Sequence, residues 1–218
     1  MVPTKPPCSD PATALNPVLV LEGMPGAGKT TAATALAAED YSVIGEYTTP
    51  TGDLVPIHQH PAVDDDTGHQ HNWLRKHHQI HAARHQGPVV VDRDWPSALA
   101  YAHSISDTDH GVLLAARAAW AFDCLDRGEL TLATTYVLFQ LDPMVSLRRR
   151  AHRLTPGHPW STLPGLIRLA RFYADPVTAL VSVHPQLAAR LRTVTWHPLR
   201  GCSLDITIRV LRELVDQP

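Results

Sequence analysis

The stretch from Gly23 to Thr30 restricts the possible folds of this chain more than any other, because it matches the phosphate-binding pattern GxxxxGKT at every position. An apolar run, Val18–Leu21, precedes it, and an Ala-rich segment, Lys29–Ala38, follows it. Continuous apolar runs are typical of strands buried on both faces of a parallel sheet. Strand, glycine-rich loop and helix in this order predict a triphosphate-binding loop in an α/β domain.

Each kind of residue in this loop has a physical reason to be there. Glycines let backbone N–H groups close around phosphate oxygens, and the N-terminus of the following helix adds its positive dipole end. Lys29 brings a mobile charge to the β- and γ-phosphates, and the Thr30 hydroxyl is a ligand for Mg²⁺. A glycine-rich turn with an incidental lysine is the alternative, and it leaves the flanking strand and helix unexplained. We assign nucleotide binding to Gly23, Gly26, Ala27, Gly28, Lys29, Thr30 and Thr31.

Candidate strands and helical stretches alternate along the rest of the chain, which predicts βαβ units and a doubly wound parallel sheet. Residues 1–16, rich in Pro, Ser, Thr and Asp, are expected to be a flexible leader, and residues 17–218 a single domain. The further strands are expected at Ser42–Gly45, Val89–Val91, Tyr136–Leu141 and Arg192–Trp196. The further helices are expected at about His69–Gln86, Pro96–Ser104, His110–Leu125, Pro143–Arg153, Leu163–Tyr173 and Leu204–Val215.

The composition excludes several classes of partner. A formal net charge of −2 over 218 residues gives no attraction to nucleic acid or to an anionic membrane. The three cysteines, Cys8, Cys124 and Cys202, are far apart and form no CxxC pair, so neither disulfides nor a zinc site is indicated. Prolines interrupt any signal-peptide core, and no apolar run approaches the ~20 residues of a membrane span. We expect a cytoplasmic protein.

A second constellation lies at the end of the predicted strand Val89–Val91. Ligands of open parallel sheets bind at the carboxyl ends of the strands, and Asp92 and Arg93 follow there. Asp92 is placed to hold Mg²⁺ next to Thr30, and Arg93 to reach a substrate or the transferred phosphoryl group. Asp92 as a simple helix cap is the alternative. We favour the metal role, because the phosphate loop requires such a partner.

Basic residues concentrate at Arg148–Arg153. On a helix, Arg149 and Arg153 share a face by their i, i+4 spacing. Adjacent arginines repel one another, so an anionic ligand would stabilise them, and phosphoryl transfer needs cations around the γ-phosphate. A solvated basic face is the alternative. Beside a phosphate loop we favour an arginine-bearing lid over about residues 148–162.

With these pieces located, the chain resembles the thymidylate kinase and deoxynucleoside kinase branch of the P-loop kinases, in order and spacing from about Val18 to the C-terminus. Glu22–Thr31 looks like that branch's EGxxGxGKTT, Asp92–Tyr101 is similar to its DRxxxSxxAY, and Leu141–Pro143 resembles the strand end before its lid. The resemblance implies a five-stranded parallel sheet with helices on both faces. It also implies Mg-ATP as phosphoryl donor and an acceptor pocket opposite the loop.

The resemblance further assigns roles to single residues and elements. It places Arg93 at the reaction centre and Arg149 and Arg153 in the lid. It also implies a homodimer packed through long helices, which the apolar stretch His110–Leu125 suits, although a core helix of a monomer would look the same.

The chain departs from thymidylate kinases at two positions. Those enzymes carry an acid inside the loop, where this chain has Pro25, and an arginine for the acceptor phosphate, where this chain has Gly45. The departures favour a neutral hydroxyl acceptor, such as a nucleoside, a sugar or an antibiotic-like compound, over thymidine monophosphate. In deoxynucleoside kinases a Glu at the place of Glu46 is the base toward the sugar hydroxyl, and we hypothesise that role here. A surface-loop Glu is the equally weighted alternative.

Many of the fourteen histidines lie between His58 and His85. His77, His81 and His85 follow at helical spacing, but no carboxylate or cysteine matches them, so we do not assign a metal site. In the resembling kinases this region faces the acceptor. The candidate acceptor-pocket residues are therefore His58, His60, Trp73 and Arg75, with a core Trp73 as the alternative.

These patterns predict an ATP- and Mg-dependent phosphotransferase acting on a small molecule. A nucleoside monophosphate kinase of the thymidylate type is one alternative. A nucleotide-binding NTPase or switch protein is another, but the chain has no guanine-reading NKxD sequence, and Asp92 is followed by Arg93 rather than by a second acid. Lys29, Glu46, Asp92, Arg93, Arg149 and Arg153 are the candidate catalytic residues, and Thr30 and Asp92 the candidate metal ligands.

Overall fold

The computed structural model describes residues 15–62, 64–105, 110–154 and 157–217, without the side chains of His110 and Arg153. In these ranges the chain forms a five-stranded sheet in the order β2-β3-β1-β4-β5, with every neighbouring pair parallel. The sheet confirms the predicted doubly wound α/β fold. Its strands are β1 Val18–Gly23, β2 Ser42–Ile44, β3 Val89–Asp92, β4 Thr135–Gln140 and β5 Thr195–Arg200.

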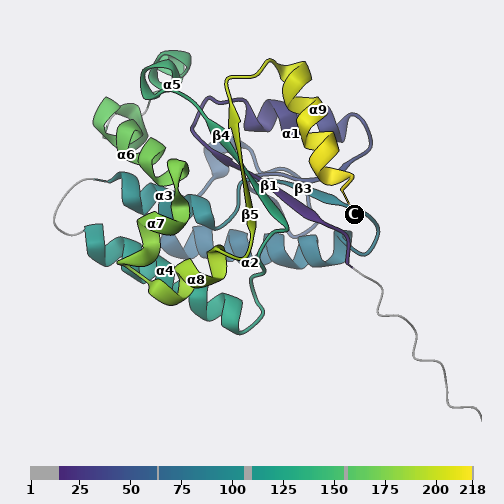
Figure 1. Ribbon diagram of the computed structural model, residues 1–218, viewed down its shortest axis with the longest axis horizontal. Helices are drawn as coiled ribbons and strands as arrows, with labels where there is room; N and C mark the ends of the chain where they lie inside the picture. Colours follow the sequence, from purple (N-terminus) through teal and green to yellow (C-terminus); the bar gives the residue numbers. More distant parts are fainter. Residues whose placement is uncertain (1–14, 63, 106–109, 155–156, 218) are drawn as a thin grey trace, which may run out of the picture.

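Helices cover both faces of the sheet (Figure 1). Helices α1 and α9 lie on one face, where Leu36 and Leu211 pack against Leu21 and Val137 of the central strands. The remaining helices form a thicker layer on the other face. In the described ranges the helices are α1 Lys29–Ala37, α2 Asp66–Ala83, α3 Pro96–Ser104, α4 His110–Asp126, α5 Pro143–Arg149, α6 Leu163–Ala174, α7 Pro176–Val181, α8 Pro185–Leu191 and α9 Leu204–Val215. Short 3-10 turns are η1 Ile57–Gln59, η2 Ala151–Arg153 and η3 Pro159–Ser161.

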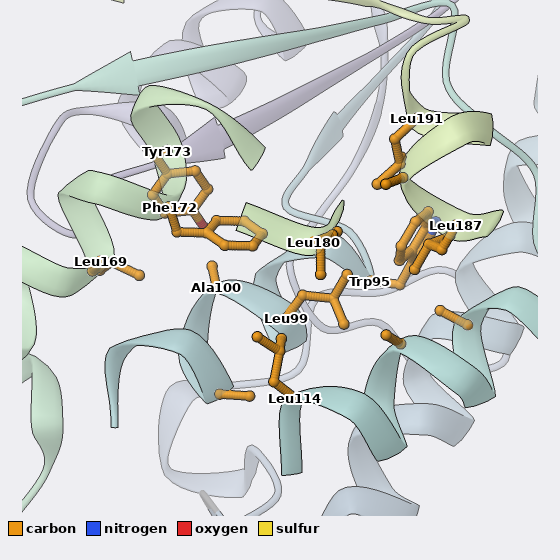
Figure 2. Packing of buried hydrophobic residues seen from close by; sticks show 14 of the residues in the cluster. Trp95, Leu99, Ala100, Leu114, Leu169, Phe172, Tyr173, Leu180, Leu187 and Leu191 are labelled. Carbon is orange, nitrogen blue, oxygen red and sulfur yellow. The ribbon is translucent and has the colours of Figure 1, made fainter. Parts of the chain in front are cut away.

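The thicker layer has a large apolar core of its own. Figure 2 shows Trp95 beside Leu187 of α8, and Leu99 of α3 near Leu180 of α7. Trp95 is 1% exposed and stands immediately before α3. The core therefore fixes the segment that follows β3, which begins with the predicted site residue Arg93.

The register of the sheet brings the ends of the central strands together. Leu21 of β1 is level with Asp92 at the end of β3, and Gly23 is level with Phe139 of β4. The phosphate loop therefore begins between two neighbouring strand ends, next to Asp92.

Four elements differ from the sequence-based expectations. Strand β5 runs over Thr195–Arg200 rather than Arg192–Trp196, and it contains Pro198, which an edge strand tolerates. Helix α5 ends at Arg149, and a separate 3-10 turn follows, so Arg149 and Arg153 do not share one helical face. Helices α7 and α8 were not predicted.

The expected leader, residues 1–16, is described only at its last two residues. Residues 1–14 of the expected leader lie outside the described residues. Asn16 is bound to the domain: its side chain donates to the Arg84 carbonyl at 2.8 Å, and its own carbonyl accepts from the Arg84 guanidinium. Among the helices that the structure describes, none combines the length and apolar character required to cross a bilayer.

Candidate active site

The backbone of the phosphate loop requires glycine at its first position. Gly23 has φ 124°, and a Cβ placed there would lie 2.4 Å from the carbonyl oxygen of Phe139 in β4. The next residue, Met24, donates its N–H to that same oxygen at 2.9 Å, so the loop starts in close contact with the strand. Gly26 and Gly28 also have positive φ, at 73° and 99°. These conformations give the loop the shape that the motif predicted.

Lys29 is buried and turned back onto its own loop. Its ammonium donates to the carbonyls of Gly23 at 3.0 Å and Met24 at 2.8 Å. Burial, with the nearby Arg93 guanidinium, lowers the pKa of Lys29 to about 7, although Asp92 and Glu22 act in the opposite direction. The lysine is thus held inside the loop, next to where phosphate oxygens would be bound.

The two candidate metal ligands are in contact. The Thr30 hydroxyl donates to Asp92 Oδ2 at 2.7 Å. The other oxygen, Asp92 Oδ1, is buried, and the described part of the chain offers it no hydrogen-bond donor. A buried, unsatisfied carboxylate oxygen beside a hydroxyl fits Mg²⁺, which takes one or two carboxylates and fills the remaining positions with water and phosphate. Among the described residues, no three His, Cys, Asp or Glu form a self-contained metal site.

Arg93 and Glu46 form an ion pair beside this metal position. Arg93 Nε lies 3.1 Å from Glu46 Oε1, its Nη1 donates to the Ser97 hydroxyl at 3.2 Å, and its guanidinium lies 5.3 Å from the centre of the Trp160 ring. Burial by itself would lower the pKa of Arg93, but neighbouring carboxylates, Glu46 foremost, outweigh it and raise the pKa. The Glu46 carboxylate is therefore held in position by Arg93 rather than pointing freely into solvent.

Glu22 contacts the candidate site in a way that the sequence analysis did not foresee. It is fully buried, and it accepts hydrogen bonds from the Asp94 backbone N–H (2.9 Å), the Ser97 hydroxyl (2.7 Å) and the Tyr173 hydroxyl (3.0 Å). Burial raises the pKa of Glu22, and Arg93 counteracts this. The carboxylate joins β1 to the segment after β3 and to α6. An acid inside an otherwise apolar strand was the available signal.

Lys76 of α2 is a second residue that the sequence reading missed. It is fully buried, and burial lowers its pKa, although Asp94 and Asp92 act in the opposite direction. Its ammonium donates to the backbone carbonyls of Asp92 at 2.9 Å and of Arg93, and reaches the Glu46 carbonyl at 3.4 Å. The signal was a single lysine in a helix otherwise rich in histidine.

The arginine segment contacts the phosphate loop. Arg149 Nη1 donates to the Gly26 carbonyl at 3.1 Å, and the Ser146 hydroxyl donates to the Pro25 carbonyl at 2.7 Å. Arg150 donates to the Trp160 carbonyl at 2.8 Å, which ties η3 to this segment. The side chain of Arg153 lies outside the described residues. Of the two arginines assigned to a lid, Arg149 is therefore the one that the structure brings to the loop.

Two cavities are lined in part by residues next to the candidate site, Trp95 in one and Ala27 in the other. One is lined by α2, α3 and α4, with Trp73, Trp95 and Arg117 in its wall. The other lies beside the phosphate loop and is lined by Ala27, Gln140, Leu141, Arg149, Cys202 and Thr207, among others.

The other candidate acceptor residues are only partly gathered. Trp73 is buried, and the centre of its ring lies 5.8 Å from the centre of the Tyr47 ring. The centre of the His60 ring lies 4.0 Å from that of Tyr47. His58 is exposed, and Arg75 donates to the Asn72 side chain. His77 is a core histidine, held between Asp94 and Thr131.

Comparisons with known proteins agree with this geometry. Residues 18–138, which span the phosphate loop, Glu46 and Asp92, match the model of a family described as an AAA domain. The chain belongs to this AAA-domain family. A search of curated proteins found no match for this AAA-domain protein.

Solved structures place this AAA-domain protein in the P-loop kinase fold. It is similar to a deoxyadenosine kinase from M. mycoides with the products dCMP and a flexible dCDP bound, with a TM-score of 0.60 and 11% identity over 91% of this chain and 98% of that one. It is also similar to a thymidylate kinase from Candida albicans, with a TM-score of 0.57 and 15% identity over 93% and 92% of the two chains. At these identities the likeness establishes the fold, which is that of the branch the motifs resemble.

Proposed function

We propose that this AAA-domain protein is an ATP- and Mg-dependent phosphotransferase that moves the γ-phosphate to a hydroxyl of a nucleoside-like or other small molecule. The observation that carries the proposal is the placement of the Glu46–Arg93 ion pair beside the Thr30–Asp92 pair. A protein that only bound or hydrolysed a nucleotide would have no need of a carboxylate and a guanidinium on the acceptor side.

Each residue of the cluster has a step in the reaction. Glu46 takes the proton of the acceptor hydroxyl as its oxygen bonds to the γ-phosphorus, while the bond from that phosphorus to the bridging oxygen breaks and leaves ADP. Arg93 and Lys29 stabilise the charge that spreads over the transferred group. Thr30 and Asp92 would hold Mg²⁺, which, when bound, neutralises the β- and γ-phosphates and orients them. Arg149 closes the donor side and excludes water.

The charges on the acceptor side favour a neutral acceptor. Arg93 is paired with Glu46, and Arg117 in the wall of the α2–α3–α4 cavity is paired with Asp66. Gly45 offers no cation at the position where an arginine would handle an acceptor phosphate. A thymidylate-type monophosphate kinase is therefore the weaker alternative.

The test is ADP release measured with Mg-ATP against a panel of nucleosides, nucleoside monophosphates, sugars and aminoglycosides. We expect acceptor-dependent ADP release with at least one neutral hydroxyl compound. Lys29→Ala should abolish it, and Glu46→Gln should lower kcat by about 10²–10⁴-fold, the range of general-base catalysis. Acceptor-independent hydrolysis as the sole activity would refute the kinase proposal in favour of an NTPase. Wild-type turnover in Glu46→Gln would refute the base assignment.

We also propose that the enzyme is cytoplasmic and acts as a homodimer through α4. This helix buries Leu114, Ala118 and Ala121 in the core, while Val112 is 72% exposed on its other side. Light scattering should give twice the 23.9 kDa of one chain, and Val112→Asp should return the monomer mass. A monomer mass for the wild type would contradict the dimer and leave the kinase proposal untouched.

A further inference from the structure

Lys76 occupies an unusual position for a charged side chain. It lies in the middle of α2, is 0% exposed, and none of its three hydrogen bonds goes to a side chain. An ammonium has three N–H groups, and three backbone carbonyls surround this one. Burying a charge is costly unless it is fully hydrogen-bonded, so the arrangement requires a reason beyond packing.

The three carbonyls belong to the residues of the proposed reaction centre. They are those of Glu46, the proposed base; Asp92, the proposed metal ligand; and Arg93, the proposed phosphoryl-binding cation. Glu46 follows β2 and Asp92 ends β3, so one side chain spans the ends of two strands. A neighbour on the same helix face, Asn72, supports it by donating to the Glu46 carbonyl at 3.0 Å.

The backbone of Arg93 shows what this contact holds in place. Arg93 has φ 59°, in the left-handed region that residues with a side chain seldom occupy. In this conformation its carbonyl meets Lys76, while its guanidinium meets Glu46 and Ser97. Strained backbone persists where the surroundings over-determine it, and the Lys76 ammonium is a strong partner for the strained residue's carbonyl.

We propose that Lys76 is a positioning residue of the phosphotransfer reaction, which holds Arg93 in its left-handed conformation and thereby aligns the guanidinium with Glu46 and Asp92. The inference rests on the proposed function. Lys76 does not touch the reacting atoms, so it acts on turnover rather than on substrate binding.

Kinetics of Lys76→Met provide the first test. The substitution keeps the length of the side chain and removes the ammonium, and we expect kcat to fall by about 10²-fold, the effect of misplacing a reacting group by about 1 Å. KM for ATP and for the acceptor should stay within about threefold of wild type. Lys76→Gln, which keeps two N–H donors, should give an intermediate kcat and provides a second variant if the methionine protein does not fold.

Ile80→Ala is the matched control for this test. It removes another buried side chain of α2, one turn farther along, without touching the site. It should lower the melting temperature and leave kcat unchanged. An unchanged kcat in Lys76→Met, or an equal loss in Ile80→Ala, would overturn the proposal.

A second test needs no enzymatic activity and so separates this inference from the proposed function. Arg93→Ala and Arg93→Gly both remove the guanidinium, but only alanine retains the strain of a Cβ at positive φ. Adding Lys76→Met should lower the melting temperature less in the alanine background than in the glycine background, because the alanine backbone can then leave its strained conformation and recover the strain energy. Equal shifts in the two backgrounds would overturn the role of Lys76, whatever the substrate of the enzyme.

Discussion

Gly23 shows how one residue determines the shape of the phosphate loop. A Cβ at this position would lie 2.4 Å from the Phe139 carbonyl oxygen, and the backbone φ of 124° is itself unfavourable for a residue with a side chain. At Gly28 a Cβ would have no atom within 4 Å, so only the φ of 99° is unfavourable. Strain at one such residue costs about 1–3 kcal/mol. Gly23→Ala should therefore raise the Kd for Mg-ATP at least about tenfold, and more than Gly28→Ala does. Calorimetric titration measures both, and equal effects would contradict the role of the β4 contact.

The two described cysteines differ in exposure, and the exposed one can be used to probe the proposed nucleotide-binding side of the molecule. Burial raises the pKa of the Cys124 thiol to about 11, so at pH 8 only about one molecule in a thousand carries its thiolate, and the fraction grows as pH rises toward 11. Cys202 is exposed and lines the cavity beside Arg149. Iodoacetamide at pH 8 should alkylate Cys202 and spare Cys124 in the folded protein, as measured by peptide mass spectrometry. Saturating Mg-ATP should slow the labelling of Cys202; no protection would place the nucleotide elsewhere.

The candidate site residues that sequence analysis named are those that belong to a local pattern. Lys29, Thr30 and Asp92 follow strand ends with fixed spacing, and the sheet register brings them together as expected. The roles of Glu22 and Lys76 were missed, because their partners lie 16 to 151 residues away in the chain. Such contacts depend on the three-dimensional packing of α2 and α6, so an acid in an apolar strand and a single lysine in α2 mark unusual residues without indicating their partners.

At the scale of elements, the strands with continuous apolar runs were predictable and the edge strand was not. Strands β1 and β3 are buried along their whole length, so composition alone marks them. Strand β5 lies at the sheet edge and mixes exposed polar residues with Pro198. Without a continuous apolar run to mark it, its start was predicted three residues too early. Helices α7 and α8 are short, and each begins with a proline after a capping residue, Asp175 or His184, a signal that is weak outside a periodic stretch.

Helix α5 contains two adjacent arginines, Arg148 and Arg149, and substituting each in turn tests whether this helix is part of a lid. Arg149 donates to the phosphate loop at Gly26, while its exposed neighbour Arg148 donates, within the described part of the chain, to the Met144 carbonyl of its own helix. A hydrogen bond to a charged group contributes about 1.5–3 kcal/mol, so Arg149→Ala should raise the KM for ATP by roughly ten- to a hundredfold. Arg148→Ala should stay within about twofold of wild type in the same steady-state assay. Equal effects would indicate a diffuse basic surface and contradict a specific lid contact.

At the scale of the whole molecule, the nucleotide should act as a structural component. The phosphate loop, β3 and α5 meet around the donor side, so a ligand there stabilises the folded state by mass action, by about 2.7 kcal/mol at a concentration of 100 times Kd. For a chain of this length each kcal/mol corresponds to about 2–4 °C, which predicts a rise of about 5–10 °C in the melting temperature with Mg-ATP.

The dependence of this thermal shift on the metal distinguishes the roles of the strand-end residues. Asp92 Oδ1 has no hydrogen-bond donor in the part of the chain that the structure describes. The stability that Mg²⁺ adds by binding this oxygen is therefore the part of the thermal shift that EDTA removes. Asp92→Asn should melt at the same temperature with Mg-ATP as with ATP and EDTA, and Lys29→Met should show almost no shift with either. If wild type were stabilised equally with and without Mg²⁺, Thr30 and Asp92 would be partners of each other alone, and the metal would have to be held by the phosphates without the protein.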